Sequence, residues 1–440
     1  MRPVASGNQG AGWETKDKSA NGSMENINSK IINSTYYWSQ GFTGEGVTVA
    51  LIDTGVVPVN GLAGDGKVVN GPDLSFDGPS NELRYLDLFG HGTHIAGIIA
   101  GSDNGAPTDL NPGSAKRHFL GVAPGAQILN VKVGDAIGSA DVSQVIAGLN
   151  WVVAHRNDVG MNVRVITLAY GIDATTDYQV DALAYAVEAA WRAGIVVVVA
   201  AGNDGNSHAL RNPAFDPFVV SVGAVDTKGT QSTNDDTVLP FSNCGTGSRS
   251  VDVLAPGASV ISLRDPGSFA DFFFPQARVG DRFFRGTGTS QAAAIVAGAA
   301  ALVLEQRPEL TPDQVKGLLM STAQEIPSAS GLCESAGLID MKTLFRASTP
   351  ATVQTWPLAT NSGAEGWIEV DGQWDGQTWG GQTWGGQTWG GQTWGGQTWG
   401  GQTWGGQTWG GQTWGGQTWG GQTWGGQTWG GQTWASYIWN

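Results

Sequence analysis

Three short motifs contain an acid, a base and a nucleophile, in the order aspartate, histidine, serine. Asp53 ends the apolar run VTVALID, His91 begins HGTHIAG, and Ser290 lies within GTGTSQAAA. A serine hydroxyl is a weak nucleophile at neutral pH, so it needs a base that accepts its proton. That base needs a carboxylate to fix its tautomer and to stabilise the imidazolium. The motifs together predict catalysis by Ser290, with His91 as general base and acid and Asp53 orienting His91.

Each motif alone has another interpretation. Asp53 could cap the turn after its strand, and Ser290 could cap the helix that follows it. Aspartic proteases also use Asp-Thr-Gly, but they need two carboxylates that share a proton, and no second such motif occurs. His91 and His94 could bind a metal, but the glutamate of zinc-binding helices and a source of a third ligand are missing. We therefore favour the Asp-His-Ser interpretation and assign no metal ligands.

With the segment VVAAGNDG, these motifs resemble those of the subtilase family of serine peptidases, over residues 33–347. The chain order aspartate, histidine, serine is one of the known orders for this catalytic geometry. The resemblance implies that the Asn203 side chain donates a hydrogen bond to the oxyanion, beside the backbone N–H of Ser290. Such a donor stabilises the transition state more than the ground state. Without the resemblance, Asn203 would be interpreted as a turn residue.

The resemblance also implies that an extended peptide substrate pairs with exposed backbone edges beside the nucleophile. One edge is expected near residues 138–140 and another near 169–171. The first specificity pocket would lie between residues 169–171 and 200–202. Tyr170 departs from the smaller aliphatic residue usual at the cleft edge. The expected substrate-binding residues are Gly138, Ala169, Tyr170, Gly171, Ala200, Gly202 and Arg211.

Arg211 stands where the family often has a glycine at the floor of this pocket. One hypothesis is that Arg211 narrows the pocket or favours acidic or small residues at the cleavage position. The alternative is an arginine that points to solvent, since arginine is rarely buried without a partner.

An α/β pattern surrounds the motifs and must position them. Short apolar runs rich in β-branched residues are typical of buried parallel strands, and the stretches between them have apolar residues at helical spacing. The alternation predicts βαβ units and hence a doubly wound, mostly parallel sheet flanked by helices, as in subtilisin-like proteins. Strands are expected at 47–52, 128–133, 163–168, 195–201 and 218–225, and helices at 141–155, 180–192, 290–306 and 312–323.

Composition divides the chain into an N-terminal extension (1–34), a peptidase domain (35–348), a linker (349–374) and a repeat tail (375–440). In the tail, a tryptophan recurs every five residues from Trp379 to Trp434 within Gly-Gly-Gln-Thr-Trp repeats. Period five fits neither a helix face nor a strand face. The alternatives are a coil that stacks its tryptophans and a disordered low-complexity segment. Indoles stack on sugars, so this tail is a candidate contact with a cell surface or glycan.

The net charge and the hydropathy of the chain limit the classes of partner that it can bind, and its two cysteines allow one disulfide. A net charge of −15 disfavours nucleic-acid binding, and no run reaches the roughly 18 apolar residues of a membrane span. Protein or peptide substrates are expected, with no cofactor for the chemistry. Cys244 and Cys333 could form one bridge, which the sequence leaves open.

Subtilases often bind structural calcium. We assign no calcium ligands, because the loop 102–117 holds Asp103, Asn104 and Asp109 without a recognisable ligand spacing. The resemblance further implies an extracellular or cell-surface protein, although residues 1–34 lack the basic-then-apolar pattern of a signal peptide.

The alternative to an active enzyme is a binding or adhesive protein whose protease-like domain serves as a scaffold. Such domains usually lose a catalytic residue. All three are present here together with Asn203, which favours the enzyme.

Overall fold

The computed structural model describes residues 22–103, 118–174, 177–247, 249–351, 354–359, 369–370 and 373–374. Internal contacts divide the chain into two units. The first comprises residues 1–174, 189–356 and 432–440, and the second comprises 175–188 and 357–431. The predicted repeat tail, 375–440, lies outside the described residues.

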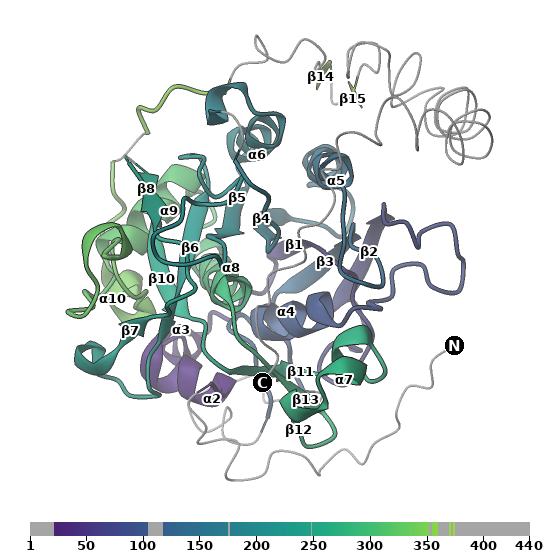
Figure 1. The fold of residues 1–440 in the computed structure, drawn as a ribbon, viewed down its shortest axis with the longest axis horizontal. Helices are drawn as coiled ribbons and strands as arrows, with labels where there is room; N and C mark the ends of the chain where they lie inside the picture. The colour runs from purple at the N-terminus through teal and green to yellow at the C-terminus, as the bar shows by residue number, and fades with distance from the viewer. Residues whose placement is uncertain are drawn as a thin grey trace. The chain divides into compact units, whose positions relative to one another are not determined.

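A mostly parallel sheet forms the centre of the first unit (Figure 1). The strand order is β10-β6-β5-β4-β1-β3-β2, and β7 pairs antiparallel with β6. The predicted fold class is confirmed for this unit. The strands are β1 (Thr48–Asp53), β2 (Val68–Asp73), β3 (Gln127–Lys132), β4 (Val163–Leu168), β5 (Val196–Ala200), β6 (Val220–Asp226), β7 (Thr237–Val238) and β10 (Val253–Pro256).

Strand β5 shows why such runs fold as central strands. Each of its five residues is buried, and β-branched side chains fit a pleated surface that is covered on both faces. All five predicted strands occur, with ends that differ from the prediction by at most two residues.

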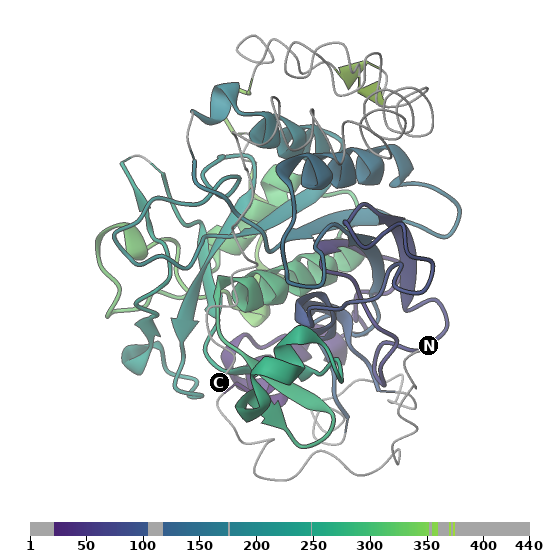
Figure 2. The ribbon, with the colours of Figure 1, turned by 45° about the vertical axis from the view of Figure 1, so that its right-hand side comes forward.

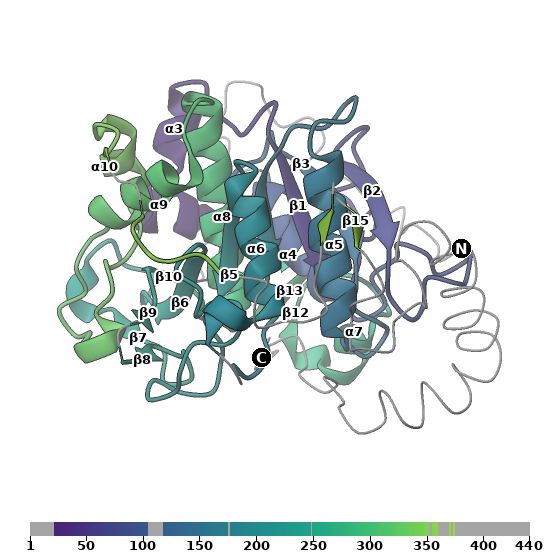
Figure 3. The same cartoon turned by 90° about the horizontal axis from the view of Figure 1, so that it is seen from above.

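Helices cover both faces of this sheet. Figures 1 and 2 show α8 (Thr289–Gln306) on one side and α5 (Val142–His155) on the other, and Figure 3 shows α5 lying over β1 and β3. Helix α4 (His91–Ala100) packs against α8. Residues 289–304 of α8 are all buried, which is typical of a helix surrounded by core. Helix α9 (Pro312–Ser321) begins with a capping box in which Thr311 is the N-cap.

The remaining helices are short, apart from α6, and among them only α6 was predicted from the sequence. They are α2 (Met24–Asn26), η1 (Ile27–Ile31), α3 (Thr35–Ser39), η2 (Tyr178–Val180), α6 (Ala182–Arg192), η3 (Thr233–Asp235), α7 (Phe269–Phe273), η4 (Pro275–Ala277), η5 (Gly331–Cys333) and α10 (Met341–Arg346).

Part of the expected N-terminal extension is folded. Met24, Ile27 and Ile32 are fully buried, and the amide of Asn28 donates to the Leu120 carbonyl at 3.1 Å. The backbone N–H of Ile261 donates to Gly22 at 2.8 Å. The folded part of the chain therefore begins before residue 35.

In the described part of the first unit, two small antiparallel sheets lie outside the predicted pattern. One has the order β11-β13-β12, and its strand β13 leads directly into α8. The other pairs β8 with β9. These strands are β8 (Gly245–Thr246), β9 (Arg249–Ser250), β11 (Val260–Leu263), β12 (Arg278–Val279) and β13 (Phe283–Gly286).

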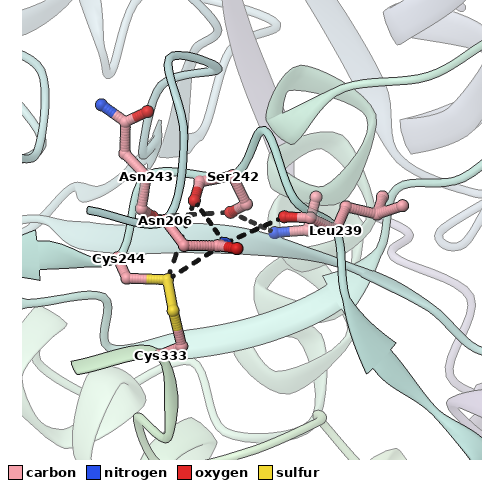
Figure 4. Close-up of a disulfide and its surroundings, with 7 residues drawn as sticks. Asn206, Leu239, Ser242, Asn243, Cys244 and Cys333 are labelled. Atoms are coloured by element: carbon pink, nitrogen blue, oxygen red, sulfur yellow. Dashed lines mark hydrogen bonds between the residues drawn. A yellow bond between two sulfur atoms is a disulfide. The ribbon is translucent and has the colours of Figure 1, made fainter. Parts of the chain in front are cut away.

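A disulfide joins Cys244 to Cys333, which decides the pairing that the sequence left open. Figure 4 shows the Asn206 amide beside this bond. Its nitrogen donates to the carbonyls of Leu239 and Ser242 at 3.0 and 2.9 Å, and it lies 3.5 Å from the Cys244 sulfur. The bridge thereby connects η5 to the loop that follows β7.

The second unit contains η2, part of α6 and the hairpin of β14 (Glu369–Val370) with β15 (Gln373–Trp374). The Tyr178 hydroxyl donates to the Pro357 carbonyl at 2.9 Å, and the Ala359 N–H donates to the Glu188 carboxylate at 2.8 Å. Across the described ranges of both units, no helix has the length and apolar character needed to cross a bilayer.

Candidate active site

Asp53 and His91 form a buried pair at the carboxyl end of β1. Asp53 is the last residue of that strand and His91 is the first residue of α4. The His91 Nδ1 atom lies 2.8 Å from Asp53 Oδ1 and 2.9 Å from Oδ2. An Nδ1–H that donates to a carboxylate fixes the tautomer in which Nε2 is the basic nitrogen. This is the geometry that a general base requires.

A second aspartate, Asp87, ties this pair to the start of α4. Its carboxylate accepts the N–H groups of Gly90 and Thr93 at 2.6 and 2.7 Å. It also accepts the Thr54 hydroxyl at 2.8 Å, and the oxygen of that hydroxyl accepts the Gly92 N–H at 2.9 Å. Burial raises the pKa of Asp87 above its usual range. Asp87 was not predicted from the sequence, although an aspartate shortly before a helix start can accept backbone N–H groups there.

Ser290 reaches the same edge of the sheet. Its Oγ lies 3.5 Å from the Ala169 carbonyl oxygen, and Ala169 directly follows β4. Strands β4 and β1 are parallel, with Leu168 opposite Ile52, so Ala169 lies beside Asp53. The contacts of His91 with Asp53 and of Ser290 with Ala169 therefore place the first turns of α4 and α8 at this edge.

Asn203 is held by the first residue of α8. Its amide oxygen accepts both the N–H and the hydroxyl of Thr289, each at 3.0 Å. The side chain is buried, with 4% of the residue exposed. These contacts fix which end of the amide faces Thr289, so the nitrogen, which is the donor, forms the opposite end.

The expected substrate edges are linked through Tyr170. We expected this residue at the cleft edge, but its side chain is buried, and its hydroxyl donates to the Ala140 carbonyl at 3.3 Å. Burial raises the pKa of Tyr170, so the phenol remains a hydrogen-bond donor. Tyr170 thus joins residues 169–171 to 138–140. Ala169 and Ala200 are also buried.

Gly138 packs against an aromatic ring at the same edge. It has a φ of +80°, and a methyl group added to it would lie 2.9 Å from the ring of Phe89. Both the backbone conformation and the contact require glycine at this position.

The residues considered for metal binding have other contacts. Burial, reinforced by the charge of His91, lowers the pKa of His94 to about 3, and its Nε2 lies 3.2 Å from the Phe284 carbonyl. Asp103 pairs with Arg282, whereas Asn104 and Asp109 lie outside the described residues. Within the part of the chain that the structure describes, no three acidic, histidine or cysteine side chains gather as a metal site.

A buried Asp-His pair and a helix-borne serine, at one edge of a mostly parallel sheet, are the kinds of group that serine hydrolases use, here on an α/β fold. The chain belongs to the subtilase family, whose sequence model matches residues 44–356.

Similar proteins are serine proteases. The chain is 41% identical over 287 residues to serine protease AprX of Bacillus subtilis (strain 168). The aligned residues are 64% of this chain and 62% of AprX. It is 33% identical over 299 residues to subtilisin of Bacillus pumilus. Here the aligned residues are 66% of this chain and 88% of that protein. The match therefore spans less than two thirds of AprX but most of this subtilisin.

A solved structure of a cold-adapted subtilisin-like serine proteinase is also similar. It aligns with a TM-score of 0.52 at 32% sequence identity, and the alignment covers 68% of this chain and 90% of the solved chain.

Proposed function

We propose that this protein is a serine endopeptidase that hydrolyses peptide bonds through an acyl-enzyme on Ser290. The observation that carries this proposal is the buried contact between His91 and Asp53, at the sheet edge that Ser290 also reaches. In the proposed reaction, His91 Nε2 accepts the Ser290 proton as Oγ attacks the carbonyl carbon of the scissile bond. The imidazolium then gives this proton to the leaving amine, and Asp53 stabilises the imidazolium.

Deacylation repeats these steps with water. His91 accepts a proton from the water as the water oxygen attacks the acyl carbon, and it returns that proton to Ser290 Oγ as the ester bond breaks. The products are a new carboxyl group, a new amine and the free serine. This sequence needs no cofactor.

In this proposal Asn203 and the backbone N–H of Ser290 stabilise the oxyanion. The N–H belongs to the first turn of α8, where backbone donors have no partner within the helix. The contacts of Thr289 with the Asn203 oxygen support the same role, because they orient the amide before substrate arrives. Donors oriented in advance need no reorganisation when charge develops.

Protein or peptide chains are the proposed substrates, bound in extended form beside residues 138–140 and 169–171. The bridge between Cys244 and Cys333 supports a location in an oxidising compartment, so we propose an extracellular or cell-surface protein. The contact of the repeat tail with a cell surface or glycan stays a prediction, as does structural calcium.

Labelling with a fluorophosphonate probe tests the proposed function, because the probe reacts with an activated serine. We expect labelling of the full chain, and complete loss of labelling in Ser290→Ala. Ser39→Ala is the matched control, because the hydroxyl of Ser39 is exposed and bonds to chain neighbours: it donates to the Tyr36 carbonyl at 2.7 Å and accepts from the Gln40 amide at 3.2 Å. Folded wild-type protein that takes up no label would instead support the scaffold interpretation.

A further inference from the structure

The aliphatic stem of Arg211 lies between the two segments that are expected to form the walls of the primary specificity pocket. A methyl group added to Gly171 would lie 2.8 Å from the Arg211 Cβ, and one added to Gly202 would lie 2.6 Å from its Cγ. Both distances are shorter than van der Waals contact, so the stem fills the space beside both glycines. The backbone N–H of Arg211 donates to the Ala201 carbonyl at 3.0 Å, which fixes the origin of the side chain.

Two carboxylates hold the guanidinium group of Arg211. Its Nε donates to Asp204 Oδ2 at 2.6 Å and its Nη2 donates to Oδ1 at 2.5 Å, while Nη1 pairs with Asp173. Two parallel bonds to one carboxylate give a fixed geometry. Asp204 is held in turn by Asn243, whose amide nitrogen donates to Oδ2 at 3.0 Å. The hydrogen bonds from Arg211 lower the pKa of Asp204, so this carboxylate stays charged.

These contacts decide between the two interpretations of Arg211. Its side chain is 16% exposed and fully paired, so it is not an arginine that points to solvent. Its charge is already matched by Asp204 and Asp173. A substrate carboxylate placed here would meet two negative charges and one positive charge, which opposes binding of acidic residues. Arg211 would therefore influence the choice of substrate through the space that its aliphatic stem occupies, and not through its charge.

We propose that Arg211 is a specificity-determining residue that restricts the primary pocket to small, uncharged side chains. This inference rests on the proposed endopeptidase function, since it concerns the residue on the amino side of the scissile bond. The two aspartates hold the stem between Gly171 and Gly202, and a large side chain can enter only if this ion-paired arginine leaves. We therefore expect alanine to be accepted at this position more readily than phenylalanine.

The test measures kcat/KM on peptides that differ only in the residue before the scissile bond, using Ala, Leu, Phe, Glu and Lys. We expect the wild type to prefer Ala to Phe by at least about tenfold, because one methylene group in a pocket changes kcat/KM by about 10- to 200-fold. Arg211→Gly should raise the ratio of Phe to Ala cleavage by at least about tenfold. The ratio is measured within each variant, so a general loss of catalysis does not affect it.

Arg211→Met separates shape from charge, because methionine keeps an unbranched stem without a guanidinium group. We expect the ratio of Phe to Ala cleavage by this variant to stay within about threefold of the wild-type ratio, because the steric effect of the stem is kept. Arg211→Ala provides the shortened side chain if the glycine variant fails to fold. Lys228→Gly is the control, because it removes a more exposed cation paired with Asp226, at a turn with a φ of 50° that suits glycine. This control should leave the ratio unchanged.

Three results would overturn the inference: equal cleavage after Phe and Ala by the wild type, preferred cleavage after Glu or Lys, or an unchanged ratio in both shortened variants. Titration of the nucleophile with the fluorophosphonate probe separates these results from failure of the proposed function. A wild type that is labelled but prefers large residues contradicts only the role of Arg211. A wild type that neither takes up label nor cleaves any peptide contradicts both.

Discussion

At the scale of single residues, the site depends on side chains whose orientation is fixed before substrate binds. The carboxylate of Asp53 sets the tautomer of His91, and Thr289 sets the direction of the Asn203 amide. Each orienting contact is buried, and it therefore acts with little competition from water. The catalytic roles themselves stay predictions that substitutions can test.

We predict that Asn203→Ala lowers kcat while leaving KM nearly unchanged. The amide would act only when negative charge develops, so its loss raises the barrier without weakening substrate binding. The expected loss in kcat is about 10²- to 10³-fold, the size known for the corresponding donor in subtilisin. Steady-state kinetics on one peptide checks this, and a kcat within a few fold of wild type would remove Asn203 from the oxyanion site.

Local motifs were enough to predict Asp53, His91 and Ser290 as candidates and to pair Asp53 with His91. Asn203 was predicted only through the family resemblance, because its motif alone indicates a turn. The ion pairs of Arg211 were not predictable, because burial and pairing depend on where Asp173 lies after folding. The buried position of Tyr170 depends in the same way on the distant Ala140.

At the scale of elements, the catalytic edge is built where strands end and helices begin. Strand β1 ends at Asp53, while α4 and α8 begin at His91 and Thr289. Periodicity predicted the central strands and long helices because each has a local apolar pattern. The sheet of β11, β13 and β12 was not predicted, since its two- to four-residue strands carry too little pattern.

Asp87 gives a prediction at this scale, because it joins α4 to the turn after β1. Asp87→Ala leaves the N–H groups of Gly90 and Thr93 without this acceptor, and we expect a loss of about 1–3 kcal/mol in the free energy of unfolding. Asp87→Asn keeps an acceptor oxygen and should lose less. Urea unfolding monitored by fluorescence measures both variants, and an equal loss in the two would argue against the capping role.

At the scale of the whole molecule, one disulfide closes a long loop. Cys244 and Cys333 are 89 residues apart, and a cross-link over such a loop restricts the unfolded chain. We predict that the double variant Cys244→Ser, Cys333→Ser loses about 2–5 kcal/mol of unfolding free energy. Urea unfolding of wild type with and without reductant is the comparison, and reductant should have no effect on the double variant.

The acid stability of the fold is expected to depend on Asp252. Burial alone would raise the pKa of Asp252, but the charges of Arg249 and Lys316 outweigh it and lower this pKa to about 2. Because the folded-state pKa lies below the unfolded value of 3.8, the stabilisation is complete above about pH 4 and is lost as the pH falls towards 2.

The matching experiment compares wild type with Asp252→Asn. Their difference in unfolding free energy should be about 2 kcal/mol or more at pH 7, and it should shrink at pH 2. Asp226→Asn is the control, because its ion pair with Lys228 is more exposed to solvent. A difference that stays constant between pH 7 and pH 2 would rule out this role of Asp252.

The buried start of the folded chain limits how far the N-terminus can be shortened without loss of stability. Met24, Ile27 and Ile32 are fully enclosed, and each contributes about 1.5–3 kcal/mol through burial. A cut after Ile32 would release all three from the core together with the backbone pairing at Gly22. A form that begins at residue 33 is therefore expected to be less stable than one that keeps the chain from Gly22 onward.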